Sequence, residues 1–359
     1  MSTTTAQPKI RLMPLGALDD RHLDRWRALQ ATNPDLQSPF FAPEFALGFQ
    51  RQGHLVQVAV IEHNSEIAAF FPFERGGLAR AGAQDQAMRL LGAGCPAGRR
   101  LSDSHGLISA PGFTFDAQKL LAACRLNAWD FHRLAPNQPT FSQYQTGRQD
   151  WHIIDLRLGY AAYLAGITTT STDVLKQTAM KARRLVRAAG PLSFKSNLND
   201  PKLLSTLLTW RYARHPEADE IDGLRPDALK ALLTHFLSVQ TAALSGRLSA
   251  LYAGDQIAAL HFGLVSPDVL VYWFLSFNPA FANYSPGIIL LLRLIEQAGH
   301  DGIKQIDLGA GTERYKQQLH SRTIPLLAGS VVRPSALALY RRIKGRLVRY
   351  DPHVEPAPV

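Results

Sequence analysis

The chain has 359 residues, of which 46% are hydrophobic, and carries a formal net charge of +10 with an isoelectric point near 9.7. This length and apolar content favour two domains with a substantial core. The sequence contains no run of about 18 apolar residues, so we expect no membrane-spanning helix. The polar start, Met1 to Pro8, lacks the apolar segment of a secretory signal. Cys95 and Cys124 are too few for a disulfide framework and lack metal-ligand spacing. We therefore expect a soluble protein of the reducing cytoplasm, without a metal.

The basic excess suits three kinds of partner, namely nucleic acid, an anionic membrane or a phosphorylated small molecule. Zinc-finger spacing, an RNP motif and a lysine-rich tail are all absent from the sequence, which argues against DNA and RNA. A basic surface without a specific partner is the remaining alternative.

Two segments, residues 61–70 and 251–260, match each other at a constant offset of 190 positions. Each has the pattern of a strand, a short polar turn and a second strand, which is typical of a tight β-hairpin. A loop, a helix and another strand follow the hairpin in both halves of the chain. The repeat therefore predicts two α+β domains in tandem, each with a mixed central sheet flanked by helices.

The first half contains an extended loop, Ser-Asp-Ser-His-Gly at residues 102–106, in which Asp103 and His105 are candidates for lining a cleft. Adjacent residues of such a loop point in different directions, and no Gly-x-Ser-x-Gly motif accompanies them, which argues against a catalytic triad. A solvated loop is the alternative. Residues 159–172 are rich in Gly, Ala and Thr without periodicity, so we expect a linker there. The predicted domains then span residues 1–165 and 166–335.

A helix is predicted over residues 173–189, because apolar residues recur at helical spacing and Gly190 follows. Its other face is basic, with Lys176, Lys181, Arg183, Arg184 and Arg187. This face is either simply solvated or turned toward phosphate groups.

Residues 269–277 are apolar on both faces, which predicts a central strand. After a short loop, Ser285 suits a helix N-cap, Pro286 suits the first helical position, and Gly287 leaves the helix entrance uncovered. The helix itself is apolar nearly all round and should be buried. Bare amides at the start of such a helix form a good anion site, although an ordinary capped helix has the same pattern.

The stretch at residues 306–316, Ile-Asp-Leu-Gly-Ala-Gly-Thr-Glu-Arg-Tyr-Lys, indicates a strand, a glycine turn and the start of a helix. A methyltransferase has a similar turn, but there it precedes several more βα units, and only 48 residues follow Gly311. The turn therefore completes a fold that lies upstream. It gathers Asp307, Tyr315 and Lys316 near one strand end, where a capped turn with a surface lysine is the structural alternative.

A last helix is predicted from about residue 335 to 350, with an apolar stripe and many arginines elsewhere around it. The segment 336–359, a basic amphipathic helix and tail, could lie on an anionic membrane or pack on its own domain.

Taken together, these motifs resemble the acetyltransferases of the GNAT superfamily, in particular the CelD-like family of cellulose and exopolysaccharide synthesis. That family is related to the FemABX peptidyltransferases, which carry two GNAT-like domains in tandem. The resemblance covers about residues 20–335 and rests on six motifs: residues 37–41, 102–106, 181–184, 254–259 and 284–287, and Asp307-x-Gly followed by Tyr315-Lys316. The usual pyrophosphate signature, Arg/Gln-x-x-Gly-x-Gly/Ala, is replaced by residues 283–287.

The resemblance implies an acyltransferase that moves an acyl group from acetyl-CoA or another acyl-CoA to an amine or hydroxyl. The acceptor would be a sugar-containing small molecule or a lipid-linked sugar of an envelope or exopolysaccharide pathway. A FemABX-like transferase that uses aminoacyl-tRNA is the alternative enzyme. A non-catalytic partner of a polysaccharide synthase, in peripheral contact with the inner membrane, is the alternative from another class.

For a direct attack in a ternary complex, we expect Lys316 to stabilise developing charge, Tyr315 to protonate the leaving thiolate, and Asp307 to orient both. The predicted donor-binding residues are Phe277, Asn283, Ser285 and Gly287. The predicted acceptor-binding residues are Asp103, His105, Arg183 and Arg184.

Overall fold

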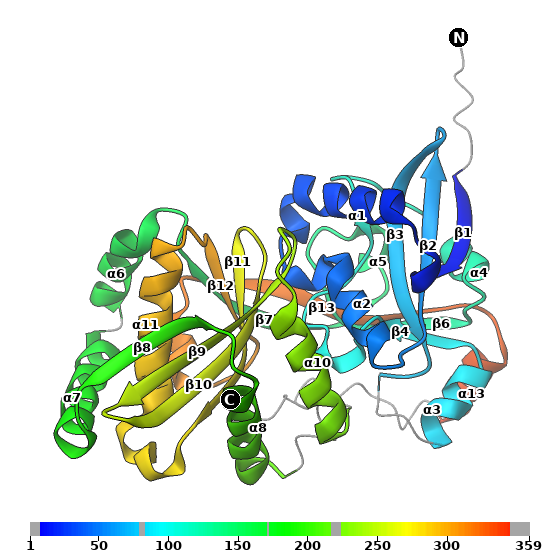
Figure 1. Ribbon diagram of the computed structural model, residues 1–359. Helices are drawn as coiled ribbons and strands as arrows, with labels where there is room; N and C mark the ends of the chain where they lie inside the picture. The colour runs from blue at the N-terminus through cyan, green and yellow to red at the C-terminus, as the bar shows by residue number, and fades with distance from the viewer. Residues whose placement is uncertain (1–7, 79–82, 171, 217–223, 345–359) are drawn as a thin grey trace. The chain divides into compact units, whose positions relative to one another are not determined.

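The computed structural model describes residues 8–78, 83–170, 172–216 and 224–344, which fall into two compact units. The first unit takes the described residues up to 149 and from 325 onward, and the second takes those between 150 and 324. Each unit is a mixed sheet flanked by helices (Figure 1), which confirms the predicted α+β class. The chain therefore passes between the units at residues 149–150 and 324–325, whereas the sequence suggested a single junction near residue 165.

In the first unit the sheet order is β1 (Lys9–Pro14), β2 (Val56–His63), β3 (Glu66–Arg75), β4 (Ala93–Pro96), β6 (Ala128–Leu134) and β13 (Arg322–Val332). Only β4 and β6 are parallel, and the short β5 (Ile108–Ser109) pairs with β3. Its helices are α1 (Asp20–Thr32), α2 (Pro43–Arg51), α3 (Ala83–Leu90), α4 (Ala117–Ala123), α5 (Pro139–Ser142) and α13 (Ala336–Lys344). An aromatic core around Phe71, Trp129 and Phe141 joins sheet and helices.

In the second unit the sheet order is β8 (Leu192–Leu198), β9 (Ser245–Ala253), β10 (Gln256–Val265), β11 (Val269–Phe277), β12 (Gln305–Gly309) and β7 (Gln145–Asp155). Here only β11 and β12 are parallel. Its helices are α6 (Gly159–Thr170), α7 (Thr172–Ala189), α8 (Pro201–Arg214), α10 (Pro226–Ser238), α11 (Pro286–His300) and α12 (Arg314–Leu319). The two sheets therefore share one order and one set of strand directions.

The predicted repeat holds down to the register of the hairpins. In β2–β3, Ile61 faces Ala69 and Glu62 faces Ile67, so one extra residue interrupts the pairing. In β9–β10, Leu251 faces Ala259 and Tyr252 faces Ile257, with the same interruption. Residues at the offset of 190 thus occupy equivalent positions, and even the β-bulge recurs.

The two halves of the chain exchange their last strands. β7 follows the first repeat in sequence but pairs with β12 of the second unit, whereas β13 follows the second repeat but pairs with β6 of the first. Each unit is therefore completed by a strand from the other half of the sequence. Periodicity along the chain cannot reveal such an exchange, because it is decided by long-range pairing.

The expected linker at residues 159–172 is wrong, because residues 159–170 form α6 and Thr172 begins α7. Tyr163 and Ile167 of α6 are buried against α11, and the Tyr163 hydroxyl donates to the Leu319 carbonyl at 2.8 Å. Tertiary burial rather than an amphipathic pattern stabilises this helix.

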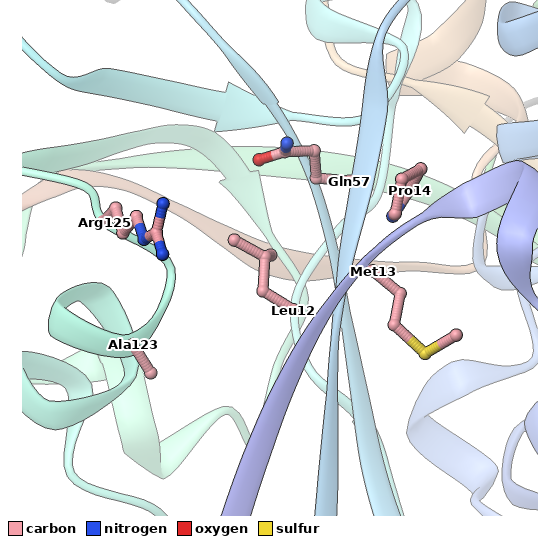
Figure 2. A pocket seen from close by; sticks show the side chains of 6 residues that line it. All are labelled: Leu12, Met13, Pro14, Gln57, Ala123 and Arg125. Atoms are coloured by element: carbon pink, nitrogen blue, oxygen red, sulfur yellow. The ribbon is translucent and has the colours of Figure 1, made fainter.

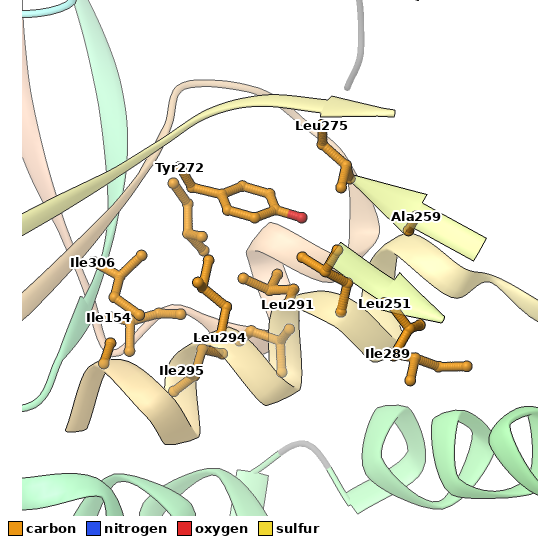
Figure 3. Packing of buried hydrophobic residues seen from close by; sticks show 14 of the residues in the cluster. Ile154, Leu251, Ala259, Tyr272, Leu275, Ile289, Leu291, Leu294, Ile295 and Ile306 are labelled. Carbon is orange, nitrogen blue, oxygen red and sulfur yellow. The ribbon is translucent and has the colours of Figure 1, made fainter. Parts of the chain in front are cut away.

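The sheet of the second unit is covered on both faces. α11, with α6 and α7, packs on the face that carries Tyr272 and Leu275 of β11 (Figure 3). α8 and α10 pack on the other face, where the Arg211 guanidinium lies 5.1 Å from the Phe274 ring centre and Phe236 contacts Trp273. β11 is thus central and buried, as its apolar sequence predicted.

α13 packs on the first unit through Leu337 and Tyr340, in a small cluster with Ala93 and Ala128. The remainder of the expected C-terminal helix and tail, residues 345–359, lies outside the described residues. Among the helices that the structure describes, none has the length and hydrophobicity required to cross a bilayer.

Candidate functional site

Strands β11 and β12 run side by side for only part of their length. Their parallel pairing covers Val269 to Val271 of β11 and Gln305 to Asp307 of β12, although β11 continues to Phe277. The last six residues of β11 therefore have an edge that β12 does not pair. Such an edge offers backbone N–H and C=O groups to an extended ligand that adds to the sheet.

The helix after β11 begins at this open part of the strand. Ser285, its N-cap, has left-handed backbone angles (φ 50°, ψ 54°), and its side chain does not cap the helix. Instead, the Ser285 hydroxyl accepts a hydrogen bond from the Lys181 ammonium of α7 at 2.7 Å. Lys181 thus adds a positive charge to the positive end of the 15-residue helix α11. The arrangement is suited to binding a phosphate or pyrophosphate group.

Gly287 allows α11 to lie close to β11, because a Cβ atom there would come within 2.9 Å of Leu275 Cδ2. Phe277 ends β11 beneath the Arg214 guanidinium, 3.7 Å from the ring centre, and Asn283 is exposed in the 3-10 turn Pro279–Tyr284. All four predicted donor residues therefore lie on the continuous segment from the end of β11 to the start of α11.

The predicted acceptor residues Arg183 and Arg184 are exposed on α7. Lys181, from the same basic sequence, is the residue that reaches α11. The sequence placed Lys181 in the motif, but it could not select the lysine over the arginines, because the choice depends on how α7 is rotated against α11.

The glycine turn after β12 is held together by Asp307 and Lys316. The Asp307 carboxylate accepts hydrogen bonds from the Trp151 indole and from the Gly309 amide, the latter at 2.8 Å. Lys316 donates to the Ala310 carbonyl and forms an ion pair with Glu313 at 3.0 Å.

Both Asp307 and Lys316 are buried, with 6% and 4% of their surfaces exposed. Lys316 is therefore not the surface lysine of the structural alternative. Its charge is already compensated by Glu313.

Tyr315 precedes Lys316 on α12 and packs against the hydrophobic cluster under α11. Its hydroxyl is buried and has no hydrogen-bond partner among the described residues. Burial, with a further contribution from the Glu313 carboxylate, raises the pKa of Tyr315 well above its usual value. The phenol therefore stays protonated and can donate a hydrogen bond to a ligand.

His152 of β7 is a further residue at this turn, and no sequence pattern singled it out. Its Nε2 lies 3.0 Å from the Gly311 carbonyl oxygen and 3.2 Å from the Gln317 amide nitrogen. The pKa of His152 is lowered, and burial is the largest of several causes. The His152 ring centre lies 4.9 Å from the ring centre of His320. His152 and Gly311 are 159 positions apart, so only the fold brings them together.

The equivalent opening in the first unit is closed by its own chain. β4 and β6 pair over only two residues each, but His105 then forms a bridge with Leu134. The His105 Nε2 accepts from the backbone amides of His132 and Arg133 at 3.3 and 3.2 Å, while Asp103 forms an ion pair with Arg133. Burial, together with Arg133, lowers the pKa of His105 to about 3. Asp103 and His105 are thus bound internally, and the open strand edge belongs to the second unit.

A surface pocket of about 420 Å³ lies in the first unit, between β1, β2 and the end of α4 (Figure 2). It is lined by Leu12, Met13, Pro14, Gln57, Ala123 and Arg125. It contains none of the predicted site residues. Over the described part of the chain, no group of three or more His, Cys, Asp or Glu side chains is arranged to hold a metal ion.

Residues 175–317 match the family model of the acetyltransferase (GNAT) domain. This range includes β11, the start of α11 and the glycine turn, which are the elements of the site. The second unit therefore carries a GNAT-type domain, and the chain is an acyltransferase. A comparison with curated proteins found no match.

Several solved structures share the fold at low sequence identity. FemX is 8% identical with a TM-score of 0.54, and the match covers 93% of this chain and all of that one. The C-terminal domain of a putative lysylphosphatidylglycerol synthetase from Agrobacterium fabrum is 12% identical, with a TM-score of 0.51 and coverage of 90% and 95%. A tandem GNAT protein of the clavulanic acid pathway is 9% identical, with a TM-score of 0.50 and coverage of 90% and 98%. At these identities the likeness concerns the fold, which is that of tandem GNAT proteins.

Proposed function

We propose that the protein transfers an acyl group from acyl-CoA to an amine or hydroxyl of a sugar or lipid-linked sugar in envelope or exopolysaccharide synthesis. The observation that carries the donor assignment is the Lys181 ammonium at the start of α11, next to the open edge of β11. A pantetheine arm could pair with that edge while its pyrophosphate lies at the helix. The sugar acceptor rests on the resemblance of the sequence to the CelD-like family.

In this proposal the chemistry is a direct attack on the thioester in a ternary complex. The Tyr315 hydroxyl, buried and protonated, donates a hydrogen bond to the leaving sulfur. Because its pKa lies above that of a thiol, the phenol stabilises the thiolate without giving up its proton completely. Asp307 and Lys316 hold the turn that carries Tyr315, so we assign them positioning roles.

Removing the lysine at the helix start should weaken donor binding. We expect Lys181→Ala to raise the Kd of acetyl-CoA by about 10–100-fold, because a hydrogen bond to a charged group contributes about 1.5–3 kcal/mol. Isothermal titration calorimetry measures this directly. Lys176→Ala, at an exposed position of the same helix, is the matched control and should leave the Kd unchanged. Equal affinities of wild type and Lys181→Ala would place the phosphates elsewhere.

The same titration distinguishes acyl-CoA from the alternative donor, aminoacyl-tRNA. A FemABX-like enzyme would not bind acetyl-CoA at this site and would instead bind aminoacyl-tRNA, which the exposed arginines of α7 could contact. A protein that binds neither donor would fit the non-catalytic role beside a polysaccharide synthase.

We also propose that α13 contacts an anionic membrane surface. Leu339 and Ile343 are 60% and 77% exposed on this helix, beside the exposed Arg342, and the chain carries a net charge of +10. Apolar side chains flanked by cationic ones suit the headgroup region of anionic lipids.

Sedimentation with phosphatidylglycerol vesicles tests this contact. The Leu339→Ser/Ile343→Ser variant should lose most of the binding, whereas Leu158→Ser, at a still more exposed leucine of the second unit, should retain it. Phosphatidylcholine vesicles should bind weakly. Failure of the wild-type protein to bind anionic vesicles would contradict the proposal. The exposed surface of α13 would then be assigned to a protein partner such as the synthase.

A further inference from the structure

Among the buried side-chain polar atoms of the second unit that lack hydrogen-bond partners within the described residues, those of three ring side chains lie in one region. They are the hydroxyls of Tyr272 and Tyr315 and both ring nitrogens of His261. His261 is fully buried, and Tyr272 is 4% exposed. Folded proteins pair nearly all such groups, because an unsatisfied buried donor or acceptor is costly. Their coincidence in one region indicates a missing polar partner.

These side chains form one cluster. The His261 and Tyr272 rings stack with their centres 4.6 Å apart and their planes inclined by 10°. Tyr272 and Tyr315 belong to the same packed region under α11. Burial is the main cause of the raised pKa of Tyr272, and Tyr315 is near enough to contribute to it. The cluster thus links β10, β11 and α12.

The cluster also lies where the donor site would hold the acyl group. Tyr272 is the first residue of β11 beyond the segment paired with β12. Figure 3 shows its ring over α11, with the hydroxyl oxygen directed toward the Leu275 end of the strand. Leu275 contacts Gly287 at the start of α11, so the hydroxyl faces the part of the strand that the proposed donor would follow.

The cluster is neutral. Burial, and to a lesser extent Arg247, lowers the pKa of His261 to about 3, and burial keeps both phenols protonated. The nearby charges of Lys316 and Glu313 compensate each other. A charged ligand group would therefore be buried without a counter-ion, which is unfavourable, whereas a neutral hydroxyl can both donate and accept here.

We infer that the acyl chain this enzyme transfers carries a neutral hydroxyl group, as a short hydroxyacyl chain does, and that Tyr272 and His261 bind that hydroxyl. The inference rests on the proposed use of acyl-CoA. Tyr272 and His261 are then residues that determine donor specificity, while Tyr315 serves the leaving sulfur.

The test compares the Kd values of butyryl-CoA and 3-hydroxybutyryl-CoA, which differ by one hydroxyl, by calorimetry. Wild-type protein should bind the hydroxylated donor about tenfold more tightly, the effect of one satisfied hydrogen bond. Tyr272→Phe should abolish this preference by weakening only 3-hydroxybutyryl-CoA, and His261→Leu should reduce it. Tyr252→Phe, at a half-buried tyrosine of β9 outside the donor segment, is the matched control and should keep the preference.

Three outcomes would overturn the inference. Equal Kd values for the two donors in wild-type protein would show that no hydroxyl is recognised. A Tyr272→Phe variant that weakens both donors equally would make Tyr272 a structural residue only. If neither donor binds to wild-type protein, the proposed use of acyl-CoA fails as well, so the two failures are distinguishable. The melting temperature of Tyr272→Phe should not fall, because its hydroxyl has no described partner to lose.

Discussion

Lys316→Ala should lower the free energy of unfolding of the second unit by about 3 kcal/mol, because it leaves Glu313 without its counter-ion. This is the low end for a broken buried ion pair, since the Glu313 side chain keeps 19% of its exposure. For a unit of this size the corresponding fall in Tm is about 6–12 °C, which differential scanning calorimetry resolves. Activity should fall with it, because the turn that carries Tyr315 loosens.

Two further variants distinguish charge from packing. Lys316→Met fills most of the volume but still leaves Glu313 unpaired, so it should be nearly as unstable as Lys316→Ala. Adding Glu313→Gln to Lys316→Met should recover part of the loss, because no unpaired carboxylate remains. An unchanged Tm for Lys316→Ala together with a large loss of turnover would instead support the direct catalytic role that the sequence suggested.

Tyr315→Phe should lower turnover and leave stability unchanged, the opposite of Lys316→Ala. We expect kcat to fall by about 10²–10³, which is the usual cost of removing one preorganised donor from a developing negative charge. The Kd of acetyl-CoA and the Tm should change little, because the hydroxyl has no hydrogen-bond partner among the described residues. Release of CoA from acetyl-CoA in the presence of an amino-sugar acceptor measures the rate, and calorimetry measures the affinity.

The pH dependence gives a second check on Tyr315. Burial and Glu313 raise its pKa, so the protonated form that donates the hydrogen bond persists well above neutral pH. The wild-type rate should therefore not fall between about pH 7 and 9 through loss of this proton. A tyrosine that titrates in this range, or a Tyr315→Phe variant with normal kcat, would contradict the assignment.

The sequence predicted the parts of the fold that depend on local patterns. The hairpin match at an offset of 190, together with the loop, helix and strand that follow each hairpin, predicted the repeat, and the two hairpins share one register and one bulge. The doubly apolar strand at residues 269–277 and the Ser-Pro-Gly start of the next helix also appear as expected. These features are determined by neighbours along the chain.

The same reasoning was wrong where burial outweighs local pattern. Residues 159–170 have no amphipathic period, yet they are helical because Tyr163 and Ile167 are covered by α11. The sequence also left open whether Lys316 lies at the surface, and the structure shows that Ala310 and Glu313 hold it inside the turn. In both cases the deciding contacts involve side-chain placement that spacing alone does not reveal.

The sequence by itself thus determined the class of fold, its internal repeat and the segment that carries the candidate site, because each depends on patterns among residues that are close together in the chain. The tertiary structure alone decided the exchange of β7 and β13, the contact of Lys181 with Ser285, and the cluster of His261, Tyr272 and Tyr315. Lys181 and Ser285 are 104 positions apart, and His152 and Gly311 are 159 apart. Contacts at such distances arise from how strands pair and how helices are rotated against the sheet, which depends on the packing of the whole unit.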